Sequence, residues 1–106
     1  MGRSEARSPS LIRFRPSAAR ELAADVRYYD AQRAERGQRF ATEVEAALAR
    51  IAARPSAFAL LIDPDIRSAK VRRFPYRIVY IVLGENIDVL AVAHAKRRPR
   101  YWRGRA

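Results

Sequence analysis

The hydrophobic positions in the first half of the chain recur at helical spacing after one short alternating segment. That segment, residues 11–14, predicts a strand, and Pro16 ends it because proline has no amide N–H to donate to a neighbouring strand. Ser17 is then the expected N-cap of a first helix, since its hydroxyl can accept a hydrogen bond from an amide of the first turn. Gly37 is the predicted break after this helix. The apolar face of the helix consists of Ala18, Leu22, Val26 and Tyr29.

A second helix, after Gly37, has the clearest period in the chain. Its apolar stripe consists of Phe40, Val44, Ala47, Leu48 and Ile51. The opposite face carries Glu43, Glu45 and Arg50. Two helices joined by a short turn form an antiparallel hairpin, whose apolar stripes need a flat surface to pack against. Pro55 closes the hairpin, and residues 56–65 are predicted to be a loop with Phe58 and Leu61 as buried anchors.

The pattern changes to period two in the second half of the chain. Residues 70–74 predict a strand, and Pro75 predicts a turn or a bulge. Residues 76–83 are largely apolar on both faces, which is typical of a central strand covered on both sides. A turn at residues 84–86 leads to a last strand at residues 87–94. The sequence therefore predicts an α+β fold with a short N-terminal strand, an antiparallel helix hairpin and a three-stranded antiparallel meander, the helices lying on one sheet face.

Length and composition limit the number of domains and the kinds of site. A chain of 106 residues predicts one domain, with residues 1–10 as a flexible N-terminal arm and residues 11–106 as the folded part. The chain has no cysteine, and His94 is its one histidine. Disulfides, thiolate metal sites and a multi-histidine zinc site are therefore excluded. No acidic cluster indicates a carboxylate site, and we expect neither a metal nor a cofactor.

The sequence indicates neither membrane insertion nor secretion. Apolar runs such as residues 78–83 are far too short to span a bilayer. The first ten residues lack the apolar segment of a secretory signal. Together with the absence of cysteine, these features lead us to expect a cytoplasmic protein.

The charge is large and unevenly distributed. The formal net charge is +11, and residues 54–106 hold twelve basic and four acidic side chains against ten and seven in residues 1–53. Arginine greatly outnumbers lysine, which a GC-rich genome would produce, but codon bias does not explain the asymmetry between the halves. Such a field attracts a polyanionic partner. The candidate target-binding or nucleic-acid-binding residues are Lys70, Arg72, Arg73, Lys96, Arg97, Arg98 and Arg100.

Three features occur in an order that resembles a known family. They are the short strand followed by a helix hairpin, the segment RRFPYRIVY at residues 72–80, and the segment VLAVAH at residues 89–94 followed by RRPRYW at residues 97–102. Over about residues 11–105 the chain resembles the RelE/ParE superfamily of toxins from type II toxin–antitoxin systems. The resemblance implies a growth-inhibiting toxin of a plasmid-stabilisation system, neutralised by a cognate antitoxin.

The resemblance also implies candidate catalytic residues. Arg77 matches in position the arginine that RelE-like nucleases place on their central strand, where a guanidinium can stabilise charge on a phosphate. Alternatively, it pairs with an acid such as Asp88 or extends to solvent. Several RelE-like nucleases use a tyrosine, a lysine or a glutamate near the chain end, which makes Tyr101 and Lys96 candidates. For Trp102, base stacking is one interpretation, but we favour a cap that pins the tail to the core.

His94 is the remaining candidate. The ordinary pKa of an imidazole, about 6.5, would let His94 exchange a proton at neutral pH. Alternatively, it is a satisfied residue at the end of a strand, where it is expected to share a face with Leu90 and Val92.

Three functions remain open after the resemblance. RelE-like members cut mRNA on the ribosome, whereas ParE-like members inhibit DNA gyrase without cutting nucleic acid. We favour ParE-like gyrase inhibition, because no tyrosine directly follows His94 and the dense lysine set of one nuclease branch is absent. The alternative is a ribosome-dependent, metal-independent mRNA endoribonuclease. A non-toxic basic module that binds nucleic acid is the third possibility. For either toxin we expect a small acidic antitoxin that lies over an uncovered sheet face or extends a sheet edge.

Overall fold

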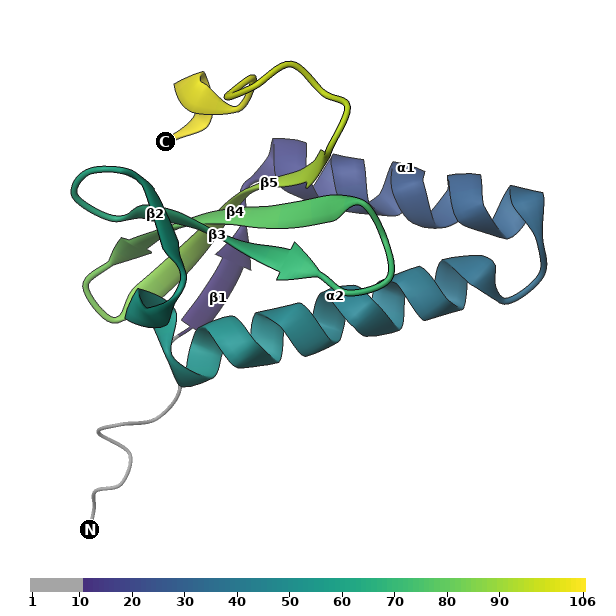
Figure 1. Cartoon of the computed structure of the whole chain (residues 1–106), viewed down its shortest axis with the longest axis horizontal. Helices are drawn as coiled ribbons and strands as arrows, with labels where there is room; N and C mark the ends of the chain where they lie inside the picture. The colour runs from purple at the N-terminus through teal and green to yellow at the C-terminus, as the bar shows by residue number, and fades with distance from the viewer. Residues whose placement is uncertain (1–10) are drawn as a thin grey trace, which may run out of the picture.

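The computed structural model describes residues 11–106, so the arm predicted at residues 1–10 lies outside the described part. Figure 1 shows the arrangement of the elements along the chain. Their bounds are β1 Leu11–Phe14, α1 Pro16–Gln32, α2 Arg36–Ala53, β2 Ala59–Ile62, β3 Ile66–Val71, β4 Tyr76–Leu83 and β5 Asn86–His94, with short 3-10 turns at Pro55–Ala57 and Arg103–Arg105. None of these helices is long and apolar enough to cross a membrane.

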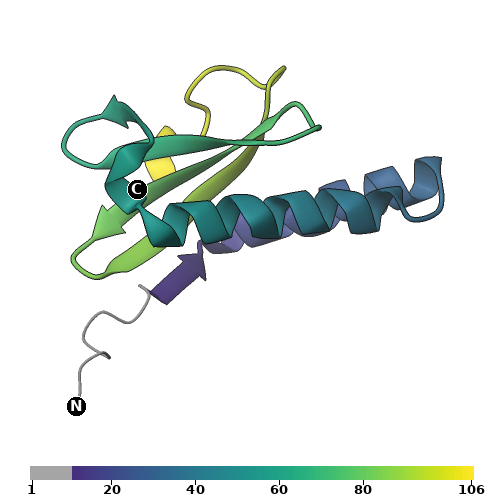
Figure 2. The same ribbon diagram turned by 60° about the horizontal axis from the view of Figure 1, so that its bottom comes forward.

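The strands form one five-stranded mixed sheet in the order β1-β5-β4-β3-β2. β1 pairs with β5 in parallel, and the other neighbours are antiparallel. Both helices cover the same sheet face, with α1 against β5 and α2 against β3 (Figures 1 and 2). We call this side the helix face. The α+β class, the helix hairpin and the antiparallel meander are therefore confirmed.

The region between the hairpin and the meander differs from the prediction. Residues 56–65 are not a loop throughout, because Ala59–Ile62 form the edge strand β2 beside β3. Four successive apolar residues carry neither a strand period nor a helix period, so this strand was not recognisable from the pattern. Phe58 and Leu61, predicted as buried anchors, are only half-buried, and they pack against the edges of the two cores.

The strand predicted at residues 70–74 is displaced toward the N-terminus. The observed β3 spans Ile66–Val71, and residues 72–75 form the turn into β4, with Arg73 in the left-handed region at φ 71°. The start of this strand was not predicted because Ser68 is polar. Its side chain is buried at a position where the alternation predicts an apolar residue. The turn at Pro75 is confirmed.

The start of α1 also differs from the prediction. Arg15, not Ser17, is the N-cap residue, and Pro16 occupies the first helical position. Proline is well suited to this position, because its fixed φ is helical and the first amide has no partner within the helix. Pro16 therefore begins the helix as well as ending the strand.

Gly37 lies inside the first turn of α2 rather than at the break between helices. A Cβ at this position would collide with the side chain of Asp30 and lie 2.5 Å from the carbonyl oxygen of Val26. The Gly37 amide also donates a hydrogen bond of 2.9 Å to Asp30 Oδ1. The glycine therefore lets α2 approach α1 closely, while the turn itself lies at residues 33–35.

The main core lies between the helices and the helix face. Its aromatic centre is formed by Tyr29, Phe40, Phe74 and Tyr76, whose ring centroids are 4.8–6.3 Å apart. Buried aliphatic residues from α2 and from the central strands surround these rings: Val44, Ala47, Ile51, Ile78, Ile87 and Val89. The apolar stripe predicted for the second helix is therefore the one that packs on the sheet.

β5 contains a bulge that changes which face each residue occupies. Val79 pairs with Ala91 and Tyr80 pairs with Val89, so Leu90 is an extra residue on the β5 side. Val89 and Val92 consequently both pack in the helix-face core, whereas Leu90 and Ala91 both belong to a second, smaller core on the other side of the sheet. The expectation that His94 shares a face with Leu90 is therefore wrong.

Candidate functional site

The C-terminal tail crosses the sheet face that the helices leave uncovered. We call residues 95–106 the tail and this side of the sheet the tail face; the tail and α2 lie on opposite sides of the sheet in Figure 1. Trp102 is 4% exposed and packs with Leu90, Ala91 and Val79 in the second core. The interpretation of Trp102 as a cap on the core is confirmed.

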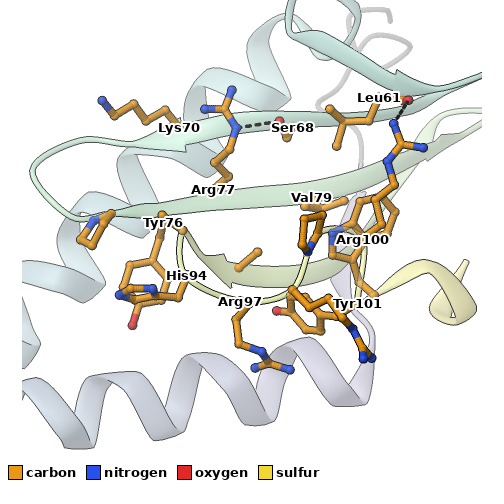
Figure 3. A pocket seen from close by; sticks show the side chains of 16 residues that line it. Leu61, Ser68, Lys70, Tyr76, Arg77, Val79, His94, Arg97, Arg100 and Tyr101 are labelled. Atoms are coloured by element: carbon orange, nitrogen blue, oxygen red, sulfur yellow. Dashed lines mark hydrogen bonds between the residues drawn. The ribbon is translucent and has the colours of Figure 1, made fainter.

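A cavity of about 580 Å³ lies between the tail and the tail face. We call it the tail cavity; Figure 3 shows it from close by. Its apolar lining comes from Leu61, Val79, Ala93, Pro99 and Trp102. Its cationic lining comes from Lys70, Arg77, Arg97, Arg98 and Arg100. The cavity therefore combines an apolar interior with positive charge contributed by both the sheet and the tail.

Arg77 extends from β4 on the tail face. Its Nε donates a hydrogen bond of 3.0 Å to Oγ of Ser68, which is 1% exposed (Figure 3). Asp88, the acid suggested as its partner, instead pairs with Arg13 at 3.0 Å and Arg15 at 3.2 Å. Arg77 is exposed, so the rest of its guanidinium can meet an anionic group at the cavity.

His94 leaves the sheet on the opposite face from Arg77. It pairs with Tyr76 across β4 and β5, whereas Arg77 pairs with Ala93, and successive side chains alternate between faces. The imidazole packs edge-on against the Tyr76 ring with centroids 4.9 Å apart. Its Nδ1 accepts a hydrogen bond of 2.9 Å from the Lys96 amide. Neutral His94 therefore carries its proton on Nε2.

Tyr101 directs its hydroxyl at a carboxylate on α1. The hydroxyl donates a hydrogen bond of 2.8 Å to Oε2 of Glu21. Burial raises the pKa of Tyr101 well above its ordinary value, and Glu21 raises the pKa further. The phenol is therefore protonated at neutral pH. All three candidate catalytic residues line the tail cavity (Figure 3). Their polar groups do not meet at one point, because Arg77 and His94 leave the sheet on opposite faces and the Tyr101 hydroxyl is bonded to Glu21.

The seven candidate binding cations separate into two groups. Arg100, with φ 59°, donates to the carbonyl oxygen of Leu61 at 3.3 Å, which draws the tail toward β2. Arg73 lies 3.8 Å from Glu43 on α2. Of these seven, Lys70, Arg97, Arg98 and Arg100 line the tail cavity together with Arg77, whereas Arg72, Arg73 and Lys96 lie outside its lining.

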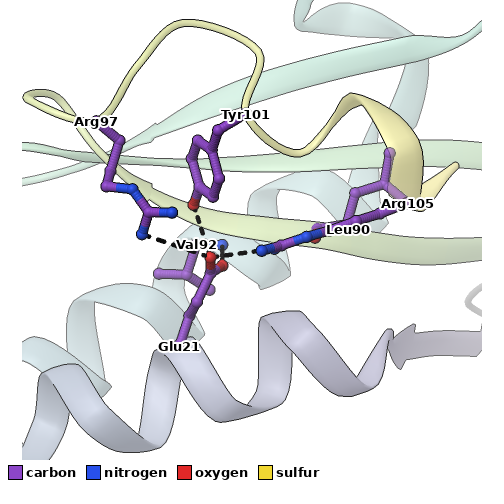
Figure 4. Close-up of polar contacts among 6 residues, drawn as sticks. All are labelled: Glu21, Leu90, Val92, Arg97, Tyr101 and Arg105. Carbon is purple, nitrogen blue, oxygen red and sulfur yellow. Dashed lines mark hydrogen bonds and ion pairs between the residues drawn. The ribbon is translucent and has the colours of Figure 1, made fainter.

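Glu21 is the residue that sequence reasoning missed. It sits on α1 and contacts β5 and three residues of the tail (Figure 4). One signal was present, because Glu21 lies three residues after Ala18 and therefore falls beside the apolar stripe of the first helix. A carboxylate at that position needs partners, but its partners lie more than 70 residues away in the chain.

A second cavity, of about 610 Å³, lies between α1 and the ends of β4 and β5. Its lining includes Asp25, Tyr28, Tyr76 and His94. Burial raises the pKa of Asp25, while the Tyr76 hydroxyl opposes this effect. Within residues 11–106, no group of three acidic or histidine side chains could hold a metal ion.

Solved structures share this fold. A structure described as a chromosomal ParDE toxin–antitoxin system from P. aeruginosa has a TM-score of 0.70 at 18% identity, covering 82% of this chain and 97% of that chain. A mutant of the E. coli toxin RelE in the free state has a TM-score of 0.66 at 22% identity, covering 92% and 94%. The isolated E. coli RelE toxin has a TM-score of 0.59 at 22% identity, covering 90% and 94%. The fold is that of the RelE/ParE toxin superfamily.

The family follows from the sequence itself. Residues 12–99 match the model of the ParE toxin of the type II toxin–antitoxin system parDE. The chain belongs to this ParE toxin family and is a toxin of a type II toxin–antitoxin system. Membership implies an antitoxin partner. No curated protein matches the chain.

Proposed function

We propose that this toxin inhibits DNA gyrase by binding it and does not cut nucleic acid. The family match over residues 12–99 supports the ParE-like branch. The observation that carries the proposal is the divergence of the candidate catalytic groups. Cleavage of RNA needs a base and an acid on either side of one phosphate, together with positive charge on its oxygens. Here Arg77 and His94 lie on opposite sheet faces.

Tyr101 does not supply the missing proton-transfer group in this proposal. Its hydroxyl is engaged with Glu21, and its ring lies under the Arg97 guanidinium, with 3.8 Å between the guanidinium carbon and the ring centroid. We assign Tyr101 to holding the tail in place. Arg77 and the tail cations around the cavity are then target-binding residues, and His94 is a packing residue against Tyr76.

The antitoxin in this proposal neutralises the toxin by occupying the tail cavity. Within the tail, the Tyr101 ring already contacts Arg97 and Arg105, and Trp102 is buried, so neither ring is open for stacking on a base. The apolar lining instead fits aliphatic side chains, and the surrounding cations fit carboxylates. An acidic, aliphatic segment of a small antitoxin has this chemistry. Because gyrase and the ribosome are both cytoplasmic, we place the toxin in the cytoplasm.

A pulse of toxin expression in cells tests the proposed target. Mapping of RNA 5′ ends and of DNA breaks in the same culture separates the two branches. Gyrase inhibition predicts DNA breaks and an SOS response with intact translated mRNA. Codon-phased cuts in translated mRNA would contradict the proposal and establish the RelE-like endoribonuclease. Normal growth without either lesion would favour the non-toxic module. Co-expression of the cognate antitoxin is the control that should abolish every effect.

A further inference from the structure

The tail is joined to α1 through a single carboxylate. Oε2 of Glu21 accepts the Tyr101 hydroxyl at 2.8 Å and lies 3.1 Å from Arg105 Nη1 and 3.9 Å from Arg97 Nη1 (Figure 4). Oε1 accepts the Val92 amide of β5 at 3.0 Å. The Glu21 side chain is 14% exposed, so these partners replace most of its contact with water.

The composition of the tail makes this carboxylate unusually important. Residues 95–106 contain six basic side chains and no acidic one. Within the described part of the chain, the ion pairs made by the tail arginines Arg97 and Arg105 both end on Glu21. The same two guanidinium groups lie over the Tyr101 ring at 3.8 and 5.1 Å from its centroid. Their mutual repulsion is offset by the carboxylate between them.

The geometry fixed by Glu21 extends to the cavity. Tyr101 and Trp102 follow directly after Arg98, Pro99 and Arg100, and all five residues line the tail side of the cavity. The position of these cations relative to Arg77 on the sheet therefore depends on where residues 101–105 are held. Arg105 adds a second attachment to β5, because its Nη1 also donates to the carbonyl oxygen of Leu90 at 3.1 Å.

We propose that Glu21 is a positioning residue for target binding, which holds the tail so that Arg98 and Arg100 face Arg77 across the tail cavity. The inference rests on the proposed function only for the identity of the target. The attachment of the tail by Glu21 does not depend on that function. Glu21 itself need not touch the target. It acts through the cations whose position it sets.

The test compares Glu21→Gln with Glu45→Gln, a matched change at an exposed position of α2. Glutamine keeps an oxygen that can accept a hydrogen bond but removes the charge that holds Arg97 and Arg105. Each variant is released from its antitoxin complex and measured for thermal unfolding, for limited trypsin cleavage followed by mass spectrometry, and for inhibition of gyrase supercoiling. Trypsin reports tail attachment directly, because the tail is rich in arginine.

We expect Glu21→Gln to lose the tail to trypsin at least roughly tenfold faster while residues 11–94 remain resistant, and to inhibit gyrase roughly tenfold or more weakly. Glu45→Gln should match the wild type in every assay. Unchanged inhibition by a folded Glu21→Gln protein would overturn the inference, whether its tail is loosened or not. If that variant does not fold, Arg105→Met breaks the attachment from the tail side and should show the same two changes to a smaller degree. A folded Arg105→Met protein with wild-type inhibition would then overturn the inference.

Failure of the proposed function gives a different result. If the wild-type toxin leaves gyrase unaffected, the gyrase assay reads the same for every variant and the target is wrong. Growth arrest on induction then replaces the gyrase assay. Under the inference, Glu21→Gln still loses growth arrest together with tail protection, whereas Glu45→Gln keeps both. Growth arrest at wild-type strength by Glu21→Gln would overturn the inference whatever the target is.

Discussion

The two faces of one sheet are covered in different ways. On the helix face, α1 and α2 bury a continuous core with four aromatic rings at its centre. On the tail face, a much smaller core is covered by the twelve-residue tail, beside a cavity lined in part by cations. The difference teaches that, under the proposed function, stability and target binding would have separate locations in this toxin. The core on the helix face contains most of the buried apolar side chains, and the tail face carries the cations that line the tail cavity.

The largest expected effect comes from opening the helix-face core. Phe40 is fully buried and contacts Tyr29, Phe74 and Tyr76. Phe40→Ala should lower the free energy of unfolding by about 3–5 kcal/mol, because the cavity it leaves cannot collapse fully. Leu83→Ala, at an exposed position of the tail face, should cost less than about 1 kcal/mol. Urea denaturation measures both, and equal losses would remove the distinction between the faces.

The next effect separates function from stability on the tail face. Arg77→Ala should abolish toxicity but lower the free energy of unfolding by only about 1 kcal/mol, since the partner left behind is the neutral hydroxyl of Ser68. Arg39→Ala, an exposed arginine of α2, is the control and should remain toxic. Growth assays beside thermal melts give the result. A toxic Arg77→Ala protein would remove Arg77 from the target-binding surface, and a loss of several kcal/mol would mean that it supports the fold instead.

Deletion of residues 103–106 has a smaller but informative effect. From sequence alone this truncation removes two arginines, a glycine and an alanine but no large apolar side chain, so we expect a folded protein with partly weakened toxicity. The structure adds a second consequence, because Arg105 bonds to Glu21 and to the Leu90 carbonyl. We therefore expect the truncated tail to exchange amide hydrogens faster at residues 96–102, measured by mass spectrometry. Unchanged exchange there would show that Trp102 alone holds the tail.

The smallest effect concerns the edge of the helix face. Burial raises the pKa of Asp25 above its unfolded value of 3.8, so ionisation of this carboxyl disfavours the folded state. Protonated Asp25 makes its whole contribution to the free energy of unfolding below pH 3.8. This contribution is lost as the pH rises through the pKa of the folded state. Asp25→Asn should therefore melt slightly higher than the wild type at pH 7, and the gain should vanish below pH 3.8. Thermal melts across pH test this, with Glu45→Gln as a control that shows no such trend.

The same contrast explains which features were readable in the sequence. The stripe from Phe40 to Ile51 shows a helical period because it packs on one continuous surface, and the pattern of β4 shows that both faces are covered. The bulge at Leu90 was not readable, because residues 89–93 are apolar on both sides of the sheet and any register fits them. β2 was not predicted for a related reason, because its four successive apolar residues show no period.

The site was less predictable than the fold. Sequence reasoning correctly placed Trp102 against the core, and Arg77 was expected on the central strand, where it is found. The bulge in β5 determines that the ring of His94 packs on the same side as Val92 but not Leu90. Glu21 meets Tyr101 across 80 residues of chain, and no local pattern reports a contact of that range.

Supercoiling by purified gyrase in the presence of increasing toxin tests the central claim most directly. The toxin is released from its antitoxin complex, and a synthetic mRNA on stalled ribosomes is incubated with the same preparation. We predict that the wild type blocks supercoiling, that Arg77→Ala does not, and that the mRNA stays intact. Full supercoiling together with cleaved mRNA would contradict the account.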